Sequence, residues 1–257
     1  MSDVTSATPA ELVHLSVGEG VATITLDSQH NRNALSRQLV TELFAHLQAA
    51  DADPDVRVVL LRAEGRVFCS GADLAEATGE GMEQGTRRIV DLQRLIVAMD
   101  KPVVTRLHGA VRAGGIGIVA ASDLVVAAED ATFALTEVKL GLAAAIISLT
   151  VHHRMNPRAA ALTTLGGEVF SGADAAAYGL VTTAVPAEAL DDEVARLCAS
   201  LATGAPQGLR ESKRILNRDL LARIDEHGAE MARLSTRLFA SDEARTAMTA
   251  FLSRGKK

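Results

Sequence analysis

Hydrophobic residues alternate between two spacings from about residue 12 to residue 185. Residues 21–26 (VATITL) have the every-second-residue pattern of β-branched side chains that is typical of a strand. After Ser36, apolar side chains recur at helical spacing, which predicts a helix that Ser36 caps and that Asp53-Pro54 ends. The apolar face of this helix is formed by Leu39, Val40, Leu43, Phe44 and Leu47. Because strands and helices keep alternating, we expect an α/β core with largely parallel strands.

The middle of the chain continues this alternation. A second helix is predicted to end at Asp100-Lys101-Pro102, and a third to start near Gly114 after a further strand. The inward face of the second helix is formed by Ile89, Leu92, Leu95, Ile96 and Met99. Residues 76–85 have poor periodicity, so we expect them to be mobile and to form one wall of a pocket.

The signals after Pro186 are purely helical. Amphipathic segments cover about residues 187–202, 206–218, 223–240 and 242–253. We therefore divide the chain into an α/β core, residues 1–185, and a C-terminal helical region, residues 186–257. The helical region carries apolar side chains that must be buried, among them Ile215, Leu216, Leu220, Leu221 and Ile224. These can pack on their own core or on neighbouring subunits, and both arrangements stay open at this point.

Composition narrows the class of protein. A chain of 257 residues is long enough for one large domain, or for one domain with a small appendage. Aromatic residues make up only 3% and Trp is absent, so the core must be built from Ala, Val, Leu and Ile. The net charge of −6 argues against a nucleic-acid-binding face, which needs a basic excess. A phosphate-bearing ligand would have to be held by local Lys and Arg side chains.

The sequence also indicates a compartment. Cys69 and Cys198 lie far apart and lack metal-ligand spacing, which favours reduced thiols, and Cys69 is interpreted as a small apolar filler. No Lys or Arg precedes Arg32, so neither a signal peptide nor a transit peptide is expected. The longest uncharged run, residues 140–153, is shorter than the roughly 20 residues that span a bilayer. We therefore expect a soluble cytoplasmic protein without membrane insertion.

Two turns of small residues carry the candidate chemistry. The first is FCSGADL at residues 68–74, which follows an apolar strand-like run at residues 56–61. The second runs from His108 to Gly115 and follows a similar run at residues 103–107. Two such turns side by side can aim two backbone N–H groups at one point, which is how an oxyanion is held without a side chain. Small residues are needed there because a Cβ would block the close approach of a ligand.

Together with their flanks, these turns resemble the enoyl-CoA hydratase/isomerase (crotonase) family. The resemblance covers nearly the whole chain in six blocks that keep the family's order. The blocks are residues 30–35 (HNRNAL), 68–74 (FCSGADL), 101–104 (KPVV) with 108–115 (HGAVRAGG), 122–124 (SDL), 133–141 (FALTEVKLG) and 177–181 (AYGLV). The resemblance implies a crotonase-like spiral core of strand–helix units. It also implies that the C-terminal helices help to assemble a homotrimer, often paired into a hexamer.

The resemblance implies the site residues as well. The thioester carbonyl would lie between the backbone N–H groups of Ala72 and Gly114, where negative charge develops during the reaction. Glu137 matches one of the family's two catalytic glutamates and would be the acid/base. The residues assigned to substrate binding are Arg32, Ala34, Ser70, Ala72, Asp73, Leu74, Gly114 and Arg112. Without the flanking match, Glu137 would be interpreted as an exposed glutamate at a strand end, paired with Lys139.

Three positions depart from the family pattern. Gly117 lies where hydratases of the family usually have a second glutamate, which weakens the hydratase interpretation and favours an isomerase with one base. Residues 141–148 are apolar where many members have a Pro- and Gly-rich turn, which predicts an apolar acyl pocket. Arg112 lies where the family tends to be apolar. It either pairs with a neighbouring acid or recognises a carboxylate of the acyl group or a phosphate of coenzyme A.

The sequence therefore predicts an acyl-CoA-processing enzyme of the enoyl-CoA hydratase type, which adds water to an enoyl-CoA thioester or removes it. One alternative is an enoyl-CoA double-bond isomerase that uses Glu137 as its single base. The other is a catalytically idle acyl-CoA-binding protein that lacks the second glutamate at Gly117. No metal and no separate cofactor are expected, because coenzyme A is part of the substrate.

Overall fold

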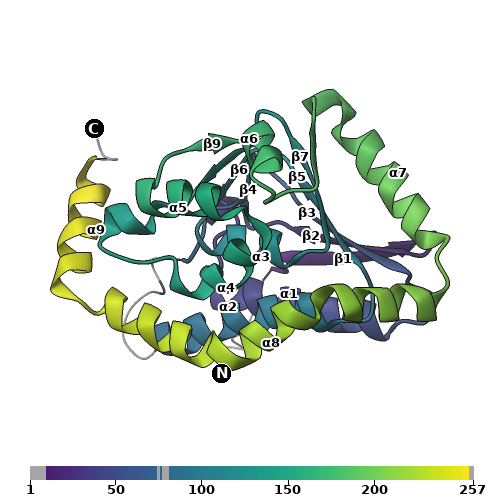
Figure 1. The fold of residues 1–257 in the computed structure, drawn as a ribbon, viewed down its shortest axis with the longest axis horizontal. Helices are drawn as coiled ribbons and strands as arrows, with labels where there is room; N and C mark the ends of the chain where they lie inside the picture. The colour runs from purple at the N-terminus through teal and green to yellow at the C-terminus, as the bar shows by residue number, and fades with distance from the viewer. Residues whose placement is uncertain (1–9, 74–75, 77–80, 255–257) are drawn as a thin grey trace, which may run out of the picture.

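The computed structural model describes residues 10–73, 76 and 81–254. Its larger sheet has six strands in the order β1-β2-β3-β5-β7-β10 (Figure 1). β1 runs antiparallel to β2, and all other neighbours in this sheet are parallel. The strands are β1 (Val13–Gly18), β2 (Val21–Leu26), β3 (Val58–Ala63), β5 (Val103–Leu107), β7 (Leu124–Ala128) and β10 (Thr183–Val185). The predicted α/β class with largely parallel strands is confirmed.

A smaller sheet of four short strands lies next to the first, in the order β4-β6-β8-β9. Its strands are β4 (Val67–Cys69), β6 (Ala110–Arg112), β8 (Thr132–Ala134) and β9 (Phe170–Ser171). Three times the chain passes directly from a strand of the larger sheet into one of the smaller sheet: β3 to β4, β5 to β6, and β7 to β8. These repeated turns are the expected spiral core.

Helices connect the turns of the spiral. The first ones are α1 (Arg37–Ala52), α2 (Gly81–Ala98) and α3 (Gly114–Ala121), followed after β8 by the 3-10 helix η2 (Thr136–Leu140), α4 (Ala145–Arg154), α5 (Pro157–Gly166) and α6 (Gly172–Ala177). The Ser36 side chain accepts a hydrogen bond from the Leu39 N–H, so α1 starts at the predicted cap. Residues 81–85, expected to be irregular, form the first turn of α2; of residues 76–80 only Glu76 lies in the described part.

The helical tail differs from its prediction in one respect. It consists of α7 (Leu190–Ala202), α8 (Pro206–Phe239) and α9 (Asp242–Arg254). The two segments predicted at 206–218 and 223–240 are one continuous helix, α8, because the residues between them, Asp219 to Ala222, include no Gly or Pro to end it. None of the helices in the described part of the chain is long and apolar enough to cross a membrane.

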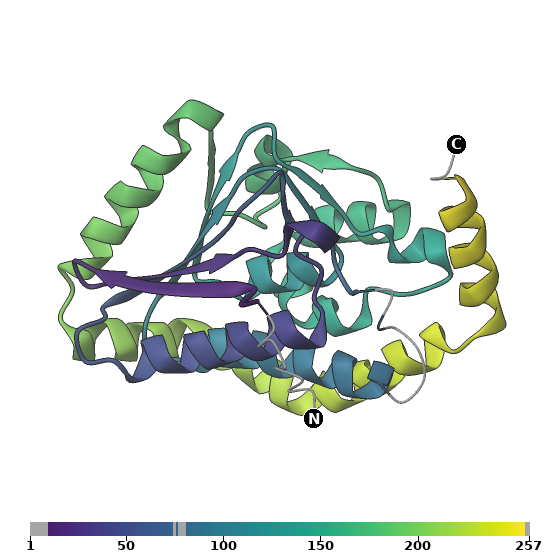
Figure 2. The same ribbon diagram turned by 180° about the vertical axis from the view of Figure 1, so that it is seen from behind.

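The tail packs on its own core. α8 runs along α2 and α4 of the same chain in both ribbon views (Figures 1 and 2). This contact buries Leu220 and Ile224, whereas Ile215 and Leu216 stay 76% exposed. Packing on the chain's own core therefore accounts for only part of the apolar face that the sequence showed.

A buried ion pair fixes α8 to the core. Lys213 is 4% exposed, and its Nζ lies 2.7 Å from Asp123 Oδ2, just before β7. The same Nζ donates to the carbonyl oxygens of Ile96 and Lys101, and Asn217 Nδ2 donates to Asp123 Oδ1 at 2.8 Å. Burial lowers the pKa of Lys213, and the attraction of Asp123 opposes this shift. Asp123 therefore has a structural role, because its carboxylate holds both Lys213 and Asn217 of α8.

We expect Lys213→Ala to lower the free energy of unfolding by about 3 kcal/mol, because removing one partner of a buried ion pair leaves an uncompensated charge. Denaturation in urea measures the change. The matched control is Arg218→Ala on the same helix, which breaks the exposed Arg218–Asp219 pair and should cost less than about 1 kcal/mol. Equal losses in the two variants would contradict this account of how α8 is held.

Candidate functional site

Ala72, Gly114 and Glu137 follow three neighbouring strands at one edge of the smaller sheet. β4 and β6 are parallel with Cys69 opposite Val111, and β6 and β8 are parallel with Arg112 opposite Ala134. Ala72 comes three residues after the end of β4, Gly114 two after β6, and Glu137 three after β8. Because the carboxyl ends of parallel strands meet at the same edge of a sheet, the register brings these residues together.

The two small-residue turns touch each other. A Cβ added to Gly71, which has φ +96°, would lie 3.0 Å from the Ala113 Cβ. A Cβ added to Gly115 would lie 2.7 Å from the Cys69 Cβ. The second turn is therefore packed so closely against the first that only hydrogen fits at these positions. Ala113 itself has φ +46°, an uncommon conformation for a residue with a side chain.

Two backbone N–H groups at this contact stay unused. The Leu35 N–H donates to the Gly71 carbonyl at 2.8 Å, whereas the Ala72 N–H has no acceptor among the described residues. The Gly114 N–H is the first of α3 and likewise has no acceptor within the described part of the chain. The N-terminal N–H groups of a helix have no partner inside it and carry the positive end of the helix dipole. An anionic oxygen is the group that such a pair of donors favours.

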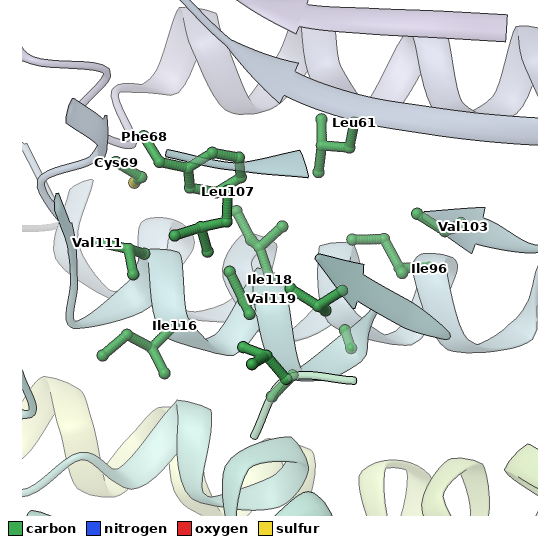
Figure 3. Close-up of a cluster of buried hydrophobic side chains, with 14 of the residues drawn as sticks. Leu61, Phe68, Cys69, Ile96, Val103, Leu107, Val111, Ile116, Ile118 and Val119 are labelled. Atoms are coloured by element: carbon green, nitrogen blue, oxygen red, sulfur yellow. The ribbon is translucent and has the colours of Figure 1, made fainter. Parts of the chain in front are cut away.

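A cluster of buried apolar side chains packs next to both turns. Phe68, Cys69, Leu107, Val111 and Ile116 lie together between α3 and the strands, and all five are fully buried (Figure 3). Burial raises the pKa of the Cys69 thiol to about 12, so the thiol is neutral and unreactive near pH 7. Cys69 is therefore the apolar filler that the sequence predicted.

Glu137 lies in the 3-10 helix η2 and not at a strand end. Its Oε2 is buried and has no hydrogen-bond partner in the described part of the chain. Burial raises the pKa of this carboxyl from 4.5 to about 7, because desolvation disfavours the charged form. Lys139, the partner considered from the sequence, points to Glu168 at 3.9 Å instead. A carboxyl whose buried oxygen has no partner among the described residues, and whose pKa lies near 7, has the properties of a general acid/base.

A cavity of about 210 Å³ starts at the first turn. Ala72 and Asp73 form its inner end, and its apolar walls come from α1, α2, α4 and the end of α8. The apolar lining residues are Leu35, Val40, Met82, Ile89, Ile146 and Phe239. Leu35 and Ile89 are also the side chains nearest to Gly114, at 2.9 and 3.9 Å from an added Cβ. The apolar cavity therefore borders Ala72 directly and shares Leu35 and Ile89 with the surroundings of Gly114.

The chain is similar to known proteins over nearly its whole length. The model of the enoyl-CoA hydratase/isomerase family matches residues 16–257. The chain belongs to this family. The protein "Probable enoyl-CoA hydratase" of Bacillus subtilis is 32% identical over 95% of this chain and 96% of its own length. The peroxisomal Delta(3,5)-Delta(2,4)-dienoyl-CoA isomerase of Arabidopsis thaliana is 27% identical over 96% of this chain and 95% of its own.

Solved structures support the same assignment. The crystal structure of an enoyl-CoA hydratase from Mycobacterium avium matches with a TM-score of 0.89 and 42% identity. The match covers 95% of this chain and 97% of that one. The crotonase-like fold that the sequence implied is therefore confirmed over nearly the full length.

The space beside Gly117 is closed. A Cβ on Gly117 would lie 2.5 Å from Ile147 Cγ2 and 3.0 Å from Gln93 Oε1. The space that a carboxylate would need is filled by these two side chains. The side chains around Gly117 therefore leave no room for a glutamate introduced there by a single substitution.

Gln93 is a site-shaping residue that sequence reasoning missed. It is fully buried in α2, and its Nε2 donates to the carbonyls of Ile89 and Ile146, two residues that line the cavity. Its Oε1 accepts from Thr150 Oγ1 at 2.7 Å. The signal was present in the sequence, since Gln93 is a polar residue four positions after Ile89 on a helix face that otherwise points inward.

The structure places the other predicted binding residues around the first turn. Arg32 is exposed, and its carbonyl accepts the Ser70 N–H at 3.1 Å. Ser70 Oγ donates to the Asn31 carbonyl, and Asn31 Nδ2 donates to Asp73 Oδ2. Ala34 is buried directly before Leu35. Leu74 lies outside the described residues.

Arg112 lies apart from this group. Its Nη1 donates to the Thr132 carbonyl at 2.6 Å and its Nη2 to Thr132 Oγ1 at 3.1 Å. No carboxylate in the described part of the chain forms an ion pair with Arg112, so the first of the two alternatives, pairing with a neighbouring acid, is not found among these residues. Burial lowers the pKa of this guanidinium. Arg112 does not line the cavity at Ala72.

No group of three or more His, Cys, Asp or Glu side chains could hold a metal ion, as far as the described ranges go. His108, which the second turn contains, lies with Nε2 2.7 Å from the Gly65 carbonyl and Nδ1 3.0 Å from Arg106 Nη1. This arrangement requires Nε2 to donate and Nδ1 to accept, which ties the turn to the preceding strand.

The raised pKa of Glu137 has a measurable effect on stability. Because the folded pKa lies above the unfolded value, the carboxyl stabilises the folded state fully below about pH 4.5, and this contribution is lost as the pH rises through about 7. A glutamine side chain does not titrate, so its contribution to stability does not change with pH. Between about pH 5 and about pH 8.5 we expect the free energy of unfolding of Glu137→Gln to rise by about 2 kcal/mol relative to the unmodified protein.

Urea denaturation of both proteins at the two pH values measures this difference. Glu188→Gln, the same change at an exposed position, is the matched control and should show no such dependence. A Glu137→Gln variant whose relative stability is the same at both pH values would show that this carboxyl is not desolvated.

Proposed function

We propose that the protein acts on an enoyl-CoA thioester by forming an enolate, with Glu137 moving the proton. The observation that carries the proposal is that three groups follow the parallel strands β4, β6 and β8 at one edge of the smaller sheet: two backbone donors and one buried carboxyl oxygen, all without a partner among the described residues. The thioester carbonyl would lie between the N–H groups of Ala72 and Gly114, and the acyl chain would enter the apolar cavity that begins at Ala72.

The physical chemistry of these groups fits an enolate. Removing a proton next to a thioester carbonyl places negative charge on its oxygen, and two preorganised donors stabilise that charge. One such donor is typically worth about 10²–10³ in rate. The base must be ionised to take the proton and must become a good acid to return it, which a pKa of about 7 allows at neutral pH.

A shift of the double bond is the reaction that the geometry supports best. Moving a proton from the α carbon to the γ carbon needs one base that takes the proton and then returns it. Hydration also needs a group that holds and activates water, and the position of the family's second glutamate is filled by Ile147 and Gln93. We therefore propose a 3-enoyl-CoA to 2-enoyl-CoA isomerase in which Glu137 performs both proton transfers.

Hydration is the second candidate. The observation in its favour is that relatives of this chain carry the name enoyl-CoA hydratase, among them the Bacillus subtilis protein and the Mycobacterium avium structure. In a hydratase, Glu137 would first take a proton from the water and then deliver a proton to the α carbon. A catalytically idle acyl-CoA-binding protein would bind the same thioesters without either reaction.

An assay with matched 2-enoyl and 3-enoyl thioesters of several lengths separates these functions. We expect kcat/KM for the double-bond shift to exceed that for hydration by about 10²-fold or more, the typical contribution of one acid/base. Because the base must be ionised, kcat/KM should fall as the pH drops below about 7. Glu137→Gln should lose about 10²–10⁴-fold.

Fast hydration that survives Glu137→Gln would contradict the proposal and point to another acid. Binding without either reaction would identify the idle protein instead. The exposed Glu188→Gln variant should retain the activity of the unmodified protein and controls for the loss of a carboxylate.

We also propose that the protein is a homotrimer or a hexamer of paired trimers. Val138, Leu162, Leu165 and Val169 are exposed, and Leu165 is 74% accessible. A Cβ on Gly167, at the end of α5, would lie 2.9 Å from Val138 Cγ1, so the end of α5 lies against η2, and we take these exposed side chains as one patch across the two elements. Contiguous exposed apolar side chains of this kind mark protein–protein contacts.

Sedimentation at micromolar concentration tests this assembly. We expect three or six times the chain mass of 26.9 kDa for the unmodified protein and a smaller species for Leu165→Glu, because a charge in the patch is costly to bury. Glu168→Gln, a neighbouring change at an exposed polar residue, is the control. A stable monomer of the unmodified protein would contradict the proposal.

A further inference from the structure

Two cavities meet at the same pair of residues. The cavity that begins at Ala72 reaches Val40 on α1 and Arg88 on α2. These two residues also line a groove of about 330 Å³ on the outside of the same helices. The other lining residues of this groove, called here the α1–α2 groove, are Thr41, Phe44, Ala45, Gln48 and Asp91.

A single hydrogen bond crosses from one helix to the other at this junction. Arg88 Nη1 donates to Thr41 Oγ1 at 2.6 Å. Arg88 is exposed, and it forms no ion pair with any carboxylate of the described residues. A long flexible side chain held by one neutral hydroxyl can leave its position at small cost, because water replaces the lost partner. The Arg88 side chain, which lines both cavities, can therefore move aside.

The α1–α2 groove has an apolar floor and a polar rim. Val40 is almost fully buried, and the half-buried Phe44 ring packs against the hydrophobic core. Ala45 is exposed and small, which leaves the groove open along α1. Arg88 and Asp91 stand along the α2 side. An aliphatic chain could lie on such a floor with water kept to the edge.

We propose that the α1–α2 groove holds the distal methylenes of a long acyl chain, and that the substrates are therefore long-chain acyl-CoA thioesters. The chain passes from the thioester site through the inner cavity and leaves between Val40 and Arg88 when the Arg88–Thr41 bond opens. The inference rests on the proposed function, since it places the thioester at Ala72. Because the groove shares Val40 and Arg88 with the inner cavity, an acyl chain is favoured over an extended peptide, which would have no strand edge to pair with between two helices.

Saturated thioesters test the groove independently of the chemistry, because they can be neither isomerised nor hydrated. Isothermal titration gives the dissociation constants of butanoyl-, octanoyl- and hexadecanoyl-CoA. We expect hexadecanoyl-CoA to bind the unmodified protein at least about ten-fold more tightly than octanoyl-CoA, because further methylenes leave water. Ala45→Trp fills the groove and should remove this advantage.

Ala49→Trp is the matched control. Ala49 is exposed on the same helix and does not line the groove, so the ratio of the two dissociation constants should stay that of the unmodified protein. Equal ratios in Ala45→Trp and Ala49→Trp would overturn the inference, as would hexadecanoyl-CoA that binds no more tightly than octanoyl-CoA.

The outcomes also separate the inference from the proposed function. Binding of butanoyl-CoA without any gain for hexadecanoyl-CoA refutes the groove alone. Failure of all three thioesters to bind refutes the thioester site at Ala72, and the groove with it.

Discussion

The register of three short parallel strands determines the site. β4, β6 and β8 pair over only two or three residues each, yet that pairing decides that the ends of all three meet at one edge. A slip by one residue would turn Val111 and Phe133 out of the core, where both are fully buried. The hydrophobic core therefore fixes the position of Ala72, Gly114 and Glu137 without any direct bond between them.

The same core sets the chemistry. Close packing leaves hydrogen as the only substituent that fits at Gly71 and Gly115, and it raises the pKa of the nearby Glu137 by removing water from its carboxyl. It also closes the space beside Gly117 with Ile147 and Gln93. The space beside Gly117 therefore has no room for a second carboxylate, and Glu137 keeps a buried oxygen without a partner among the described residues.

The sequence allowed much of this to be predicted and some of it not. The FCSGADL and HGAVRAGG turns and the Ser36 cap are local patterns, so their positions followed from the residues. The 3-10 helix η2, which carries Glu137, ends at Gly141. Gly141 lies against Ala244 of the tail, and a contact between residues so far apart in the sequence leaves no local signal. The enclosure of Gly117 depends in the same way on tertiary neighbours, whereas the unbroken α8 follows from a local feature, the absence of Gly and Pro between the two predicted segments.

The central claim is that Glu137 removes a proton from a thioester whose oxygen is held at Ala72 and Gly114. Exchange of the α protons of butanoyl-CoA in deuterium oxide, followed by NMR, measures this step without a double bond or added water. The account predicts exchange by the unmodified protein and its loss in Glu137→Gln. Gly114→Val should also lose it, because a Cβ there would lie 2.9 Å from Leu35 Cδ1 and displace the donor. Exchange that persists in Glu137→Gln, or none by the unmodified protein with butanoyl-CoA bound, would contradict the account.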